Sequence, residues 1–218
     1  MAAVANATGL TPPEDGLRFP PAGTHELAET LRSGSGGGQV EVVSCRHRDG
    51  SPVANDLRWG VYVVFEAPGD YAARCFAEYG VVTDATGRVS ALYRPFHLIG
   101  LELNVSILPA ALRGEATGAA DGFRADVVAT AKRDLLEGET LDGEGGGCVW
   151  GKLMPASASL AIGGLPIGLA SRVRLVRDVP KGRSVTWADV AMDETDAAYR
   201  FRREMEGLFG SRLASQEI

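Results

Sequence analysis

An α+β fold is the prediction for this chain of 218 residues, and three observations support it. Strand-like and helix-like segments alternate up to about residue 114. From residue 123 the sequence changes to short β-prone stretches separated by glycines. Residues 193–209 then carry apolar side chains at helical spacing. A chain of this length can bury a sizeable core in one medium and one smaller domain.

In the first half we expect helices over residues 24–33 and 68–80, the second ending at Gly80. A further helix over 95–114 should bend or break near Pro109. Strands are predicted over 39–44, 57–67 and 89–93, with a hairpin turn at Asp49-Gly50 and a flexible link over 34–38.

Residues 1–9 are rich in alanine and stop at Gly9, which is typical of a helix end. No Ser, Thr, Asp or Asn precedes them as an N-terminal cap. Two interpretations stay open: a frayed terminal helix, or a chain that is a piece of a longer protein. Local capping is a sufficient explanation for the polar Asn6.

An internal repeat marks the second half of the chain. Two segments align without a gap, RDLLEGETLD (133–142) and RDVPKGRSVT (177–186). Their charged residues, their turn glycine and their apolar residues fall at the same positions. The pattern predicts a small β domain with two pseudo-symmetric halves. Gly138 and Gly182 occupy the same position in the two copies of the repeat, where a tight turn would require a positive φ.

In the predicted C-terminal helix, Ala198, Phe201, Met205, Leu208 and Phe209 form one apolar stripe. Core packing is the first interpretation of this stripe, and a subunit contact is the second. On the other face, ion pairs are expected at Arg200–Glu204 and Arg202–Glu206.

Composition and charge exclude several classes of function. A formal net charge of −6 argues against sequence-independent binding to nucleic acid or to an acidic membrane surface. No apolar run approaches the ~20 residues that span a membrane, and no signal peptide is evident. The three widely spaced cysteines suit a reducing compartment. We therefore expect a cytoplasmic protein with no nucleic-acid or membrane partner.

A metal site is not expected either. The triplet Cys45-Arg46-His47 offers two ligand types, but zinc needs three or four convergent ligands. The remaining histidines, His25 and His97, have no ligand spacing around them.

The repeat, with Asp189-Val190 after it, resembles the SAF domain, a β-clip module, over residues 123–192. Four further segments resemble the homoserine-dehydrogenase-like oxidoreductases that carry such a domain. This family includes a branch similar in activity to deoxyxylulose-phosphate reductoisomerase. The segments are ANATGL (5–10), DLRWGVYVVFEAP (56–68), YRPFHLIGLEL (93–103) and DVVATAKRDLLEGETLDGEGG (126–146).

The resemblance implies a Rossmann domain that binds NAD(P), a middle domain that binds substrate and oligomerises, and a terminal SAF domain. A Rossmann domain requires a strand, G-x-G-x-x-G and a helix. Neither Gly34-Ser35-Gly36 nor Gly145-Gly146-Gly147 fits that context. We therefore expect an incomplete substrate/oligomerisation domain over 1–122, a SAF domain over 123–192, and a helix and tail over 193–218. The chain alone should bind no cofactor and be inactive, because the Rossmann domain is missing upstream.

A hydride-transferring site must hold a polar substrate, here a phosphorylated or carboxylated small molecule, and polarise it. Arg94 and His97 would stand at a helix start, where such an anion is favoured; a surface arginine and a capping histidine are the alternative. Lys132 has no counterpart in the second repeat, where Val176 stands. Its neighbour Arg133 is expected to form an exposed salt bridge with Asp134.

Strand alternation would send Arg58 and Glu66 to one face of the strand 57–67, which could line a substrate cleft or face solvent. No catalytic residue is identified among these candidates. The leading hypothesis is thus the substrate-binding and SAF portion of an NAD(P)-dependent oxidoreductase, expected to form a homo-oligomer. The alternatives are a non-catalytic SAF-type module that binds a sugar-like or acidic metabolite, and an oligomerisation piece.

Overall fold

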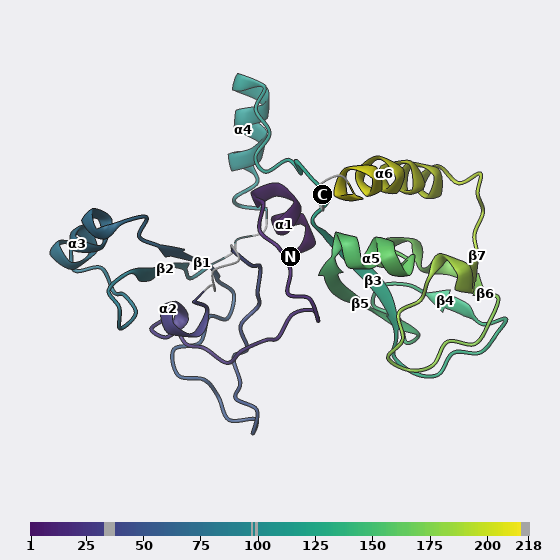
Figure 1. The fold of residues 1–218 in the computed structure, drawn as a ribbon, viewed down its shortest axis with the longest axis horizontal. Helices are drawn as coiled ribbons and strands as arrows, with labels where there is room; N and C mark the ends of the chain where they lie inside the picture. Colours follow the sequence, from purple (N-terminus) through teal and green to yellow (C-terminus); the bar gives the residue numbers. More distant parts are fainter. Residues whose placement is uncertain (33–37, 97, 99, 215–218) are drawn as a thin grey trace. The chain divides into compact units, whose positions relative to one another are not determined.

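A computed structural model describes residues 1–32, 38–96, 98 and 100–214, and its fold is α+β as predicted. The chain divides into two compact units, and each is described by itself. Met1–Leu17 and Ala120–Ile218 make up the first, and Arg18–Ala119 makes up the second (Figure 1). No helix in the described ranges combines the length and the apolar character needed to cross a membrane.

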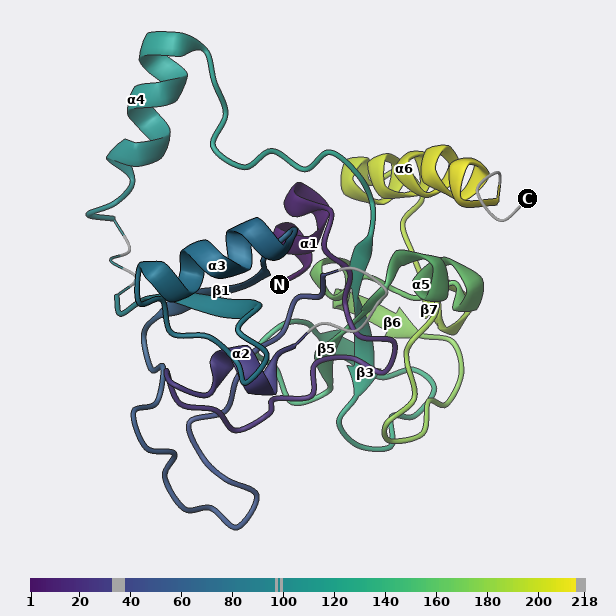
Figure 2. The same cartoon turned by 60° about the vertical axis from the view of Figure 1, so that its left-hand side comes forward.

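The unit 18–119 contains one two-stranded antiparallel sheet, in which Val63 lies opposite Leu92. Phe76 of helix α3 (Asp70–Glu78) packs edge-on against Phe65 of strand β1 (Val61–Glu66) and joins the helix to the sheet, as Figure 2 shows. Its elements are α2 (Leu27–Thr30), β1 (Val61–Glu66), α3 (Asp70–Glu78), β2 (Val89–Arg94) and α4 (Asn104–Arg113). The predicted strand 89–93 and helix 68–80 are confirmed by β2 and α3.

Two turn signals in this unit are also confirmed. Gly50 has φ 87° in the turn that follows Asp49, and Arg46 and Pro52 form an antiparallel bridge across it. Gly80 has φ 65° just after α3. Both positions need the left-handed conformation that glycine adopts without steric cost.

The predicted strand over 39–44 is wrong, because the structure has no ladder there. The buried carboxylate of Glu41 instead accepts the backbone N–H groups of Arg18, Phe19 and Val42 at 2.8–3.4 Å. Backbone donors are thus satisfied by a side chain instead of by a neighbouring strand. The alternation of apolar residues does not show that a side-chain carboxylate will take the place of a neighbouring strand as the acceptor.

The predicted helix over 95–114 is shorter than expected, since α4 begins only at Asn104. Pro109 lies inside α4 and does not end it. Proline removes one helical hydrogen bond, to the carbonyl four residues earlier. That carbonyl belongs to the exposed Val105, where water can replace the lost donor. The helix ends at Gly114 with φ 67°.

The other unit is built from two small sheets, with the strand orders β3-β5 and β4-β6-β7. Its strands are β3 (Ala125–Ala131), β4 (Thr140–Asp142), β5 (Val149–Pro155), β6 (Ser171–Leu175) and β7 (Val190–Ala191). Its helices are α1 (Ala2–Thr8), α5 (Ala156–Ile162), α6 (Ala197–Ala214) and the 3₁₀ turns η1 (Ile167–Leu169) and η2 (Trp187–Asp189).

The repeat is visible in the hydrogen bonds of this unit. Gly138 donates its N–H to the carbonyl of Leu175 at 2.9 Å, and Gly182 donates to Ala131 at 2.8 Å. The two bonds are equivalent, because donors and acceptors are both shifted by 44 residues along the chain (182 − 138 and 175 − 131). Both glycines have a positive φ, 86° and 80°, as their shared position in the repeat predicts.

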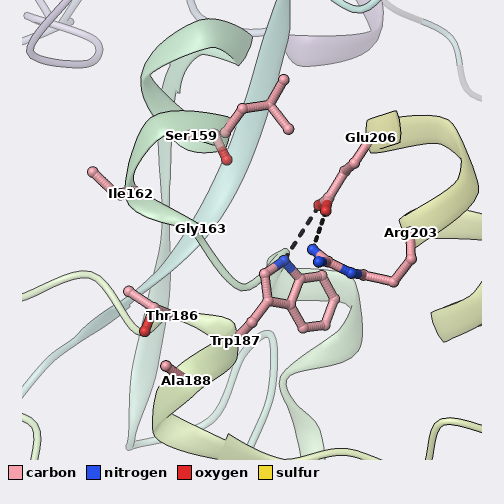
Figure 3. A pocket seen from close by; sticks show the side chains of 9 residues that line it. Ser159, Ile162, Gly163, Thr186, Trp187, Ala188, Arg203 and Glu206 are labelled. Carbon is pink, nitrogen blue, oxygen red and sulfur yellow. Dashed lines mark hydrogen bonds and ion pairs between the residues drawn. The ribbon is translucent and has the colours of Figure 1, made fainter. Parts of the chain in front are cut away.

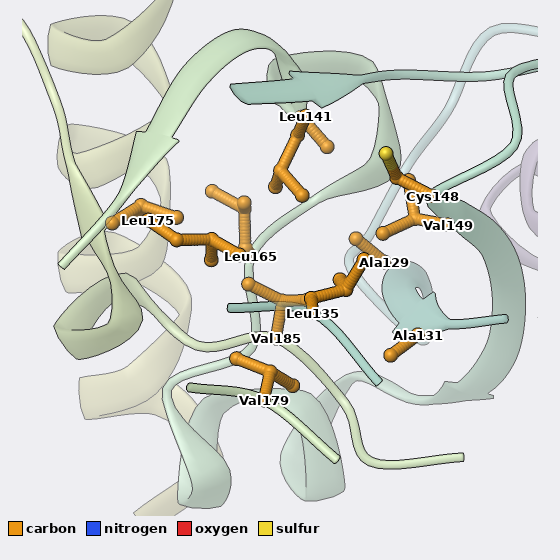
Figure 4. Packing of buried hydrophobic residues seen from close by; sticks show 12 residues of the cluster. Ala129, Ala131, Leu135, Leu141, Cys148, Val149, Leu165, Leu175, Val179 and Val185 are labelled. Carbon is orange, nitrogen blue, oxygen red and sulfur yellow. The ribbon is translucent and has the colours of Figure 1, made fainter. Parts of the chain in front are cut away.

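Aliphatic side chains from both repeats fill one core (Figure 4). Leu135 and Leu141 come from the first repeat, and Val179 and Val185 occupy the same positions in the second. All four are at most 3% exposed. Removing such a side chain would cost about 2–5 kcal/mol for leucine to alanine.

Helix α1 is anchored to β3 through Asn6. The Asn6 Oδ1 atom accepts the N–H groups of Arg124 at 2.8 Å and Ala125 at 2.9 Å, and its Nδ2 donates to the Ala125 carbonyl. Local capping is therefore the wrong explanation for Asn6. Gly9 ends the helix with φ 77°, as predicted.

Helix α6 packs through charged side chains and through part of the predicted stripe, since the Phe209 ring lies 6.0 Å from that of Phe123. Phe201 and Leu208 are 73% and 59% exposed, whereas Glu206 is buried. The expected pair Arg202–Glu206 forms at 2.7 Å, but on the buried side. Arg202 also binds Asp126 of β3, a buried carboxylate that requires a cation. This requirement favours the face of α6 that carries Arg202 as the inward face.

Candidate functional site

Arg94 ends β2, and its guanidinium is paired with the carboxylate of Glu102. It also lies 5.6 Å from the ring centre of Phe96. The Arg94 side chain is 59% exposed, so an anion from solution can reach it. An incoming carboxylate or phosphate would have to compete with Glu102. His97, the predicted neighbour, lies outside the described residues.

Arg58 does not belong to a strand, so the predicted alternation with Glu66 is wrong. Strand β1 begins at Val61, and Trp59 before it has φ 66°, which breaks an extended chain. The Arg58 guanidinium binds Asp56 and lowers the pKa of that carboxyl to about 2. Glu66 stands exposed at the far end of β1.

Lys132 follows β3 in the other compact unit, and its Nζ donates to the carbonyl of Gly146. The expected salt bridge between Arg133 and Asp134 is wrong, because Arg133 pairs with Glu139 at 2.7 Å. This hydrogen bond raises the pKa of Arg133. A site role for Lys132 stays a prediction.

The glycine-rich loop 143–147 encloses a carboxylate of its own chain. Asp142 accepts N–H groups from Gly147 and Cys148, the latter at 3.0 Å, and these bonds lower the pKa of Asp142. A Cβ on Gly146 would lie 2.1 Å from the same carboxylate. Two of the backbone donors that a phosphate could use, those of Gly147 and Cys148, are thus already bound to Asp142.

A cavity of about 260 Å³ opens between α5, η2 and α6 (Figure 3). It lies wholly within the unit that contains residues 120–218. Its walls combine the apolar side chains of Leu160, Ile162 and Trp187 with the charged groups of Arg203 and Glu206. The remaining lining residues are Ser159, Gly163, Thr186 and Ala188.

The polar wall of the cavity is held in a fixed position. Glu206 Oε1 accepts the indole N–H of Trp187 at 3.3 Å and the Nε–H of Arg202 at 2.7 Å. Arg203 binds the other oxygen, Oε2, and its guanidinium lies 5.2 Å from the ring centre of Trp187. Burial alone would lower the pKa of Arg202, but Asp126 and Glu206 outweigh it and raise that pKa. Arg202 therefore stays charged behind the cavity wall.

The sequence interpretation missed this cavity. One signal was available: Trp187 directly follows the second repeat, where Gly143 follows the first. An aromatic residue in place of a turn glycine shows that the repeats differ there. In the ranges that the structure describes, no three His, Cys, Asp or Glu side chains come together as metal ligands.

Comparison with known proteins gives one family. No curated protein matches the chain. Residues 1–103 match the family model described as the catalytic domain of oxidoreductase DRL. The matched range includes Arg58, Glu66 and Arg94, and it excludes Lys132 and the cavity. Residues 1–103 are thus similar to an oxidoreductase catalytic domain, and the match supports an oxidoreductase-family domain in this part of the chain.

Proposed function

We propose that this chain is the substrate-binding and SAF portion of an NAD(P)-dependent oxidoreductase similar to homoserine dehydrogenase. The match of residues 1–103 to an oxidoreductase catalytic domain carries the proposal. In the second half, the equivalent bonds of Gly138 and Gly182 support a duplicated β domain, which a SAF domain requires. The cofactor-binding segment is supplied by another part of the enzyme.

Arg94 is the residue that we propose to bind the substrate. Enzymes that transfer hydride must hold a polar substrate and stabilise charge on its carbonyl or alcohol oxygen. An exposed guanidinium can bind a carboxylate or a phosphate through two parallel N–H donors. The role of Arg94 is to bind and orient the substrate, while NAD(P) bound elsewhere supplies hydride transfer.

The test compares Arg94 with a matched arginine in the same unit. Arg113 is also paired with a nearby glutamate, and its side chain is 56% exposed against 59% for Arg94. Inorganic phosphate and acetate are titrated into the protein while backbone amide shifts are followed by NMR. We expect saturable shifts around Arg94 that Arg94→Ala abolishes and Arg113→Ala preserves. Equal effects of both substitutions would refute a specific anion site at Arg94.

The cofactor is tested separately by calorimetry. NADPH and NADH at millimolar concentration should give no binding heat, because two backbone donors of the glycine-rich loop 143–147, those of Gly147 and Cys148, are already bound to Asp142. A dissociation constant in the micromolar range would contradict the proposal that another segment binds the cofactor.

A further inference from the structure

We propose that the cavity between α5, η2 and α6 binds a small, neutral, polyhydroxylated molecule such as a sugar or sugar alcohol. The inference does not rest on hydride transfer or on Arg94. The cavity belongs to the other compact unit and lies outside the range that matches the oxidoreductase domain. It follows from the chemistry of three elements that contribute its walls.

The apolar side of the cavity offers a surface for C–H groups. Trp187 lies on η2 (Figure 3), and Leu160 belongs to α5. An indole presents a large, rigid apolar face with one polar edge. Here that edge is already bound to Glu206, so the ring is fixed in orientation. Sugars carry C–H faces that can pack on such a surface while their hydroxyls point outward.

The polar side offers both a donor and an acceptor. Arg203 has five N–H donors. Within the described part of the chain, one of its nitrogens donates to Glu206 Oε2, which leaves other N–H groups for a ligand. Oε2 accepts that single recorded bond, whereas Oε1 accepts two. A carboxylate oxygen has two lone pairs, so Oε2 can accept one more hydrogen bond. A ligand hydroxyl can accept from Arg203 and donate to Glu206 at the same time.

Charge balance favours a neutral ligand over an anion. Four charged side chains are joined in one network, in which Asp126 and Glu206 are balanced by Arg202 and Arg203. Their formal charges sum to zero. A ligand carboxylate would lie close to the negative charge of Glu206, which is buried and held in place by Trp187, Arg202 and Arg203, and this repulsion is unfavourable. A hydroxyl meets no such repulsion.

Size and rigidity agree with a small ligand. The volume of about 260 Å³ lies just below the ~300–1,000 Å³ typical of pockets for drug-sized molecules. Glu206 is held by Arg202, and Arg202 is held in turn by Asp126 of β3. Because these groups are ordered by the fold, little conformational entropy is lost when a ligand binds.

The test follows the indole N–H resonance of Trp187 by NMR in the full chain. Glucose and sorbitol are the neutral probes, and acetate and malonate are the anionic probes at equal concentration. We expect saturable shifts of the Trp187 signal with the neutral probes. Arg203→Ala should weaken binding at least about tenfold, the effect of losing a hydrogen bond to a charged group. Arg200→Ala, an exposed arginine on the same helix, should leave it unchanged.

A second variant guards against a folding defect in Arg203→Ala. Leu160 lines the cavity and is only half-buried, so Leu160→Phe should fill the cavity without disturbing the core. It should abolish the Trp187 shifts while the amide signals of β3 and β5 stay in place. Shifts with acetate and malonate alone would overturn the neutral-ligand proposal, and so would the absence of any saturable shift. Neither result would affect the oxidoreductase proposal, which is tested at Arg94.

Discussion

Leu135 and Val179 exchange both of their backbone hydrogen bonds. The N–H of Leu135 donates to the carbonyl of Val179 at 3.0 Å, and the reverse bond measures 2.9 Å. The two residues occupy the same position in the two repeats. A position that pairs with its own copy must lie next to the axis that relates the halves. The repeats therefore form a pseudo-two-fold pair and are not stacked in a row.

The aspartates next to this pair repeat the relationship. Asp134 accepts the N–H of Lys181 at 2.8 Å, and Asp178 accepts the N–H of Glu137 at 2.7 Å. Each carboxylate thus binds the turn of the opposite repeat. The aspartate that recurs in both copies of the motif therefore has a structural role, which is to join the two halves across the axis.

The turn glycines give the first prediction. Gly182→Ala should destabilise the protein by about 1–2 kcal/mol, because alanine in the left-handed region is strained. A Cβ on Gly182 would meet no atom within 4 Å, so the effect is conformational and not steric. Gly168→Ala is the control, since that exposed position is equally open and has no positive φ. Urea denaturation measures both, and equal stabilities would show that the turn tolerates a side chain.

The anchor of α1 gives the second prediction. Asn6→Ala removes three hydrogen bonds to Arg124 and Ala125 and should cost about 2–3 kcal/mol. Amide hydrogen exchange should then accelerate throughout α1. Thr8→Ala is the control, because the exposed Thr8 hydroxyl bonds only to its close neighbours in sequence, the carbonyl of Val4 and the N–H of Leu10, and not to β3. Rapid exchange of α1 already in the unsubstituted protein would contradict the anchoring role of Asn6.

The third prediction concerns the charged attachment of α6. Arg202→Ala should cost about 3–5 kcal/mol, because it leaves the buried carboxylates of Asp126 and Glu206 without their shared cation. Arg200→Ala should change the free energy of unfolding by at most about 0.5 kcal/mol, as expected for an exposed residue. Denaturant melts compare the two variants. A loss below about 1 kcal/mol for Arg202→Ala would mean that apolar contacts hold the helix.

Asp84 makes stability depend on pH in the unit 18–119. The N–H of Val89, together with the hydroxyl of Thr86, lowers the pKa of Asp84, although burial opposes this shift. A lowered folded-state pKa stabilises the protein above the unfolded value of about 3.9. That stabilisation is lost as the pH falls through the folded-state pKa.

Asp84→Asn should therefore reduce the loss of stability between neutral pH and a pH of about 2.5. The amide signal of Val89 in urea reports the unfolding of this unit at each pH. Asp70→Asn serves as the control, since the Asp70 side chain is 82% exposed. If the Asp84 variant keeps the full pH dependence, other carboxyl groups must cause it.

Local signals in the sequence were sufficient for the turns and for α3 and β2. Gly138 and Gly182 could be predicted because a positive φ selects glycine at the turn itself. The face of α6 could not be predicted, because Asp126, which draws Arg202 inward, lies 76 residues earlier. The spacing of apolar residues along a helix contains no information about a buried charge elsewhere in the chain.

The same distinction between local signals and contacts distant in sequence applies to the candidate sites. Arg94 could be selected because it stands beside a predicted element boundary. The cavity could not, since its walls come from α5, η2 and α6, which only the packed β domain brings together. Arg58 was misplaced because a strand pattern continues through Trp59 in the sequence, while the positive φ of Trp59 interrupts it in space.

The first seventeen residues belong to the same compact unit as residues 120–218, and this has a consequence during synthesis. The ribosome releases Asn6 more than a hundred residues before its partner Ala125. While 18–119 is still unfolded, closing a flexible loop of that length costs roughly 4 kcal/mol of chain entropy. The unit that contains the repeats therefore completes its folding only late, after the whole of 18–119 has emerged. Until then, helix α1 has to remain without the strand β3 to which Asn6 anchors it.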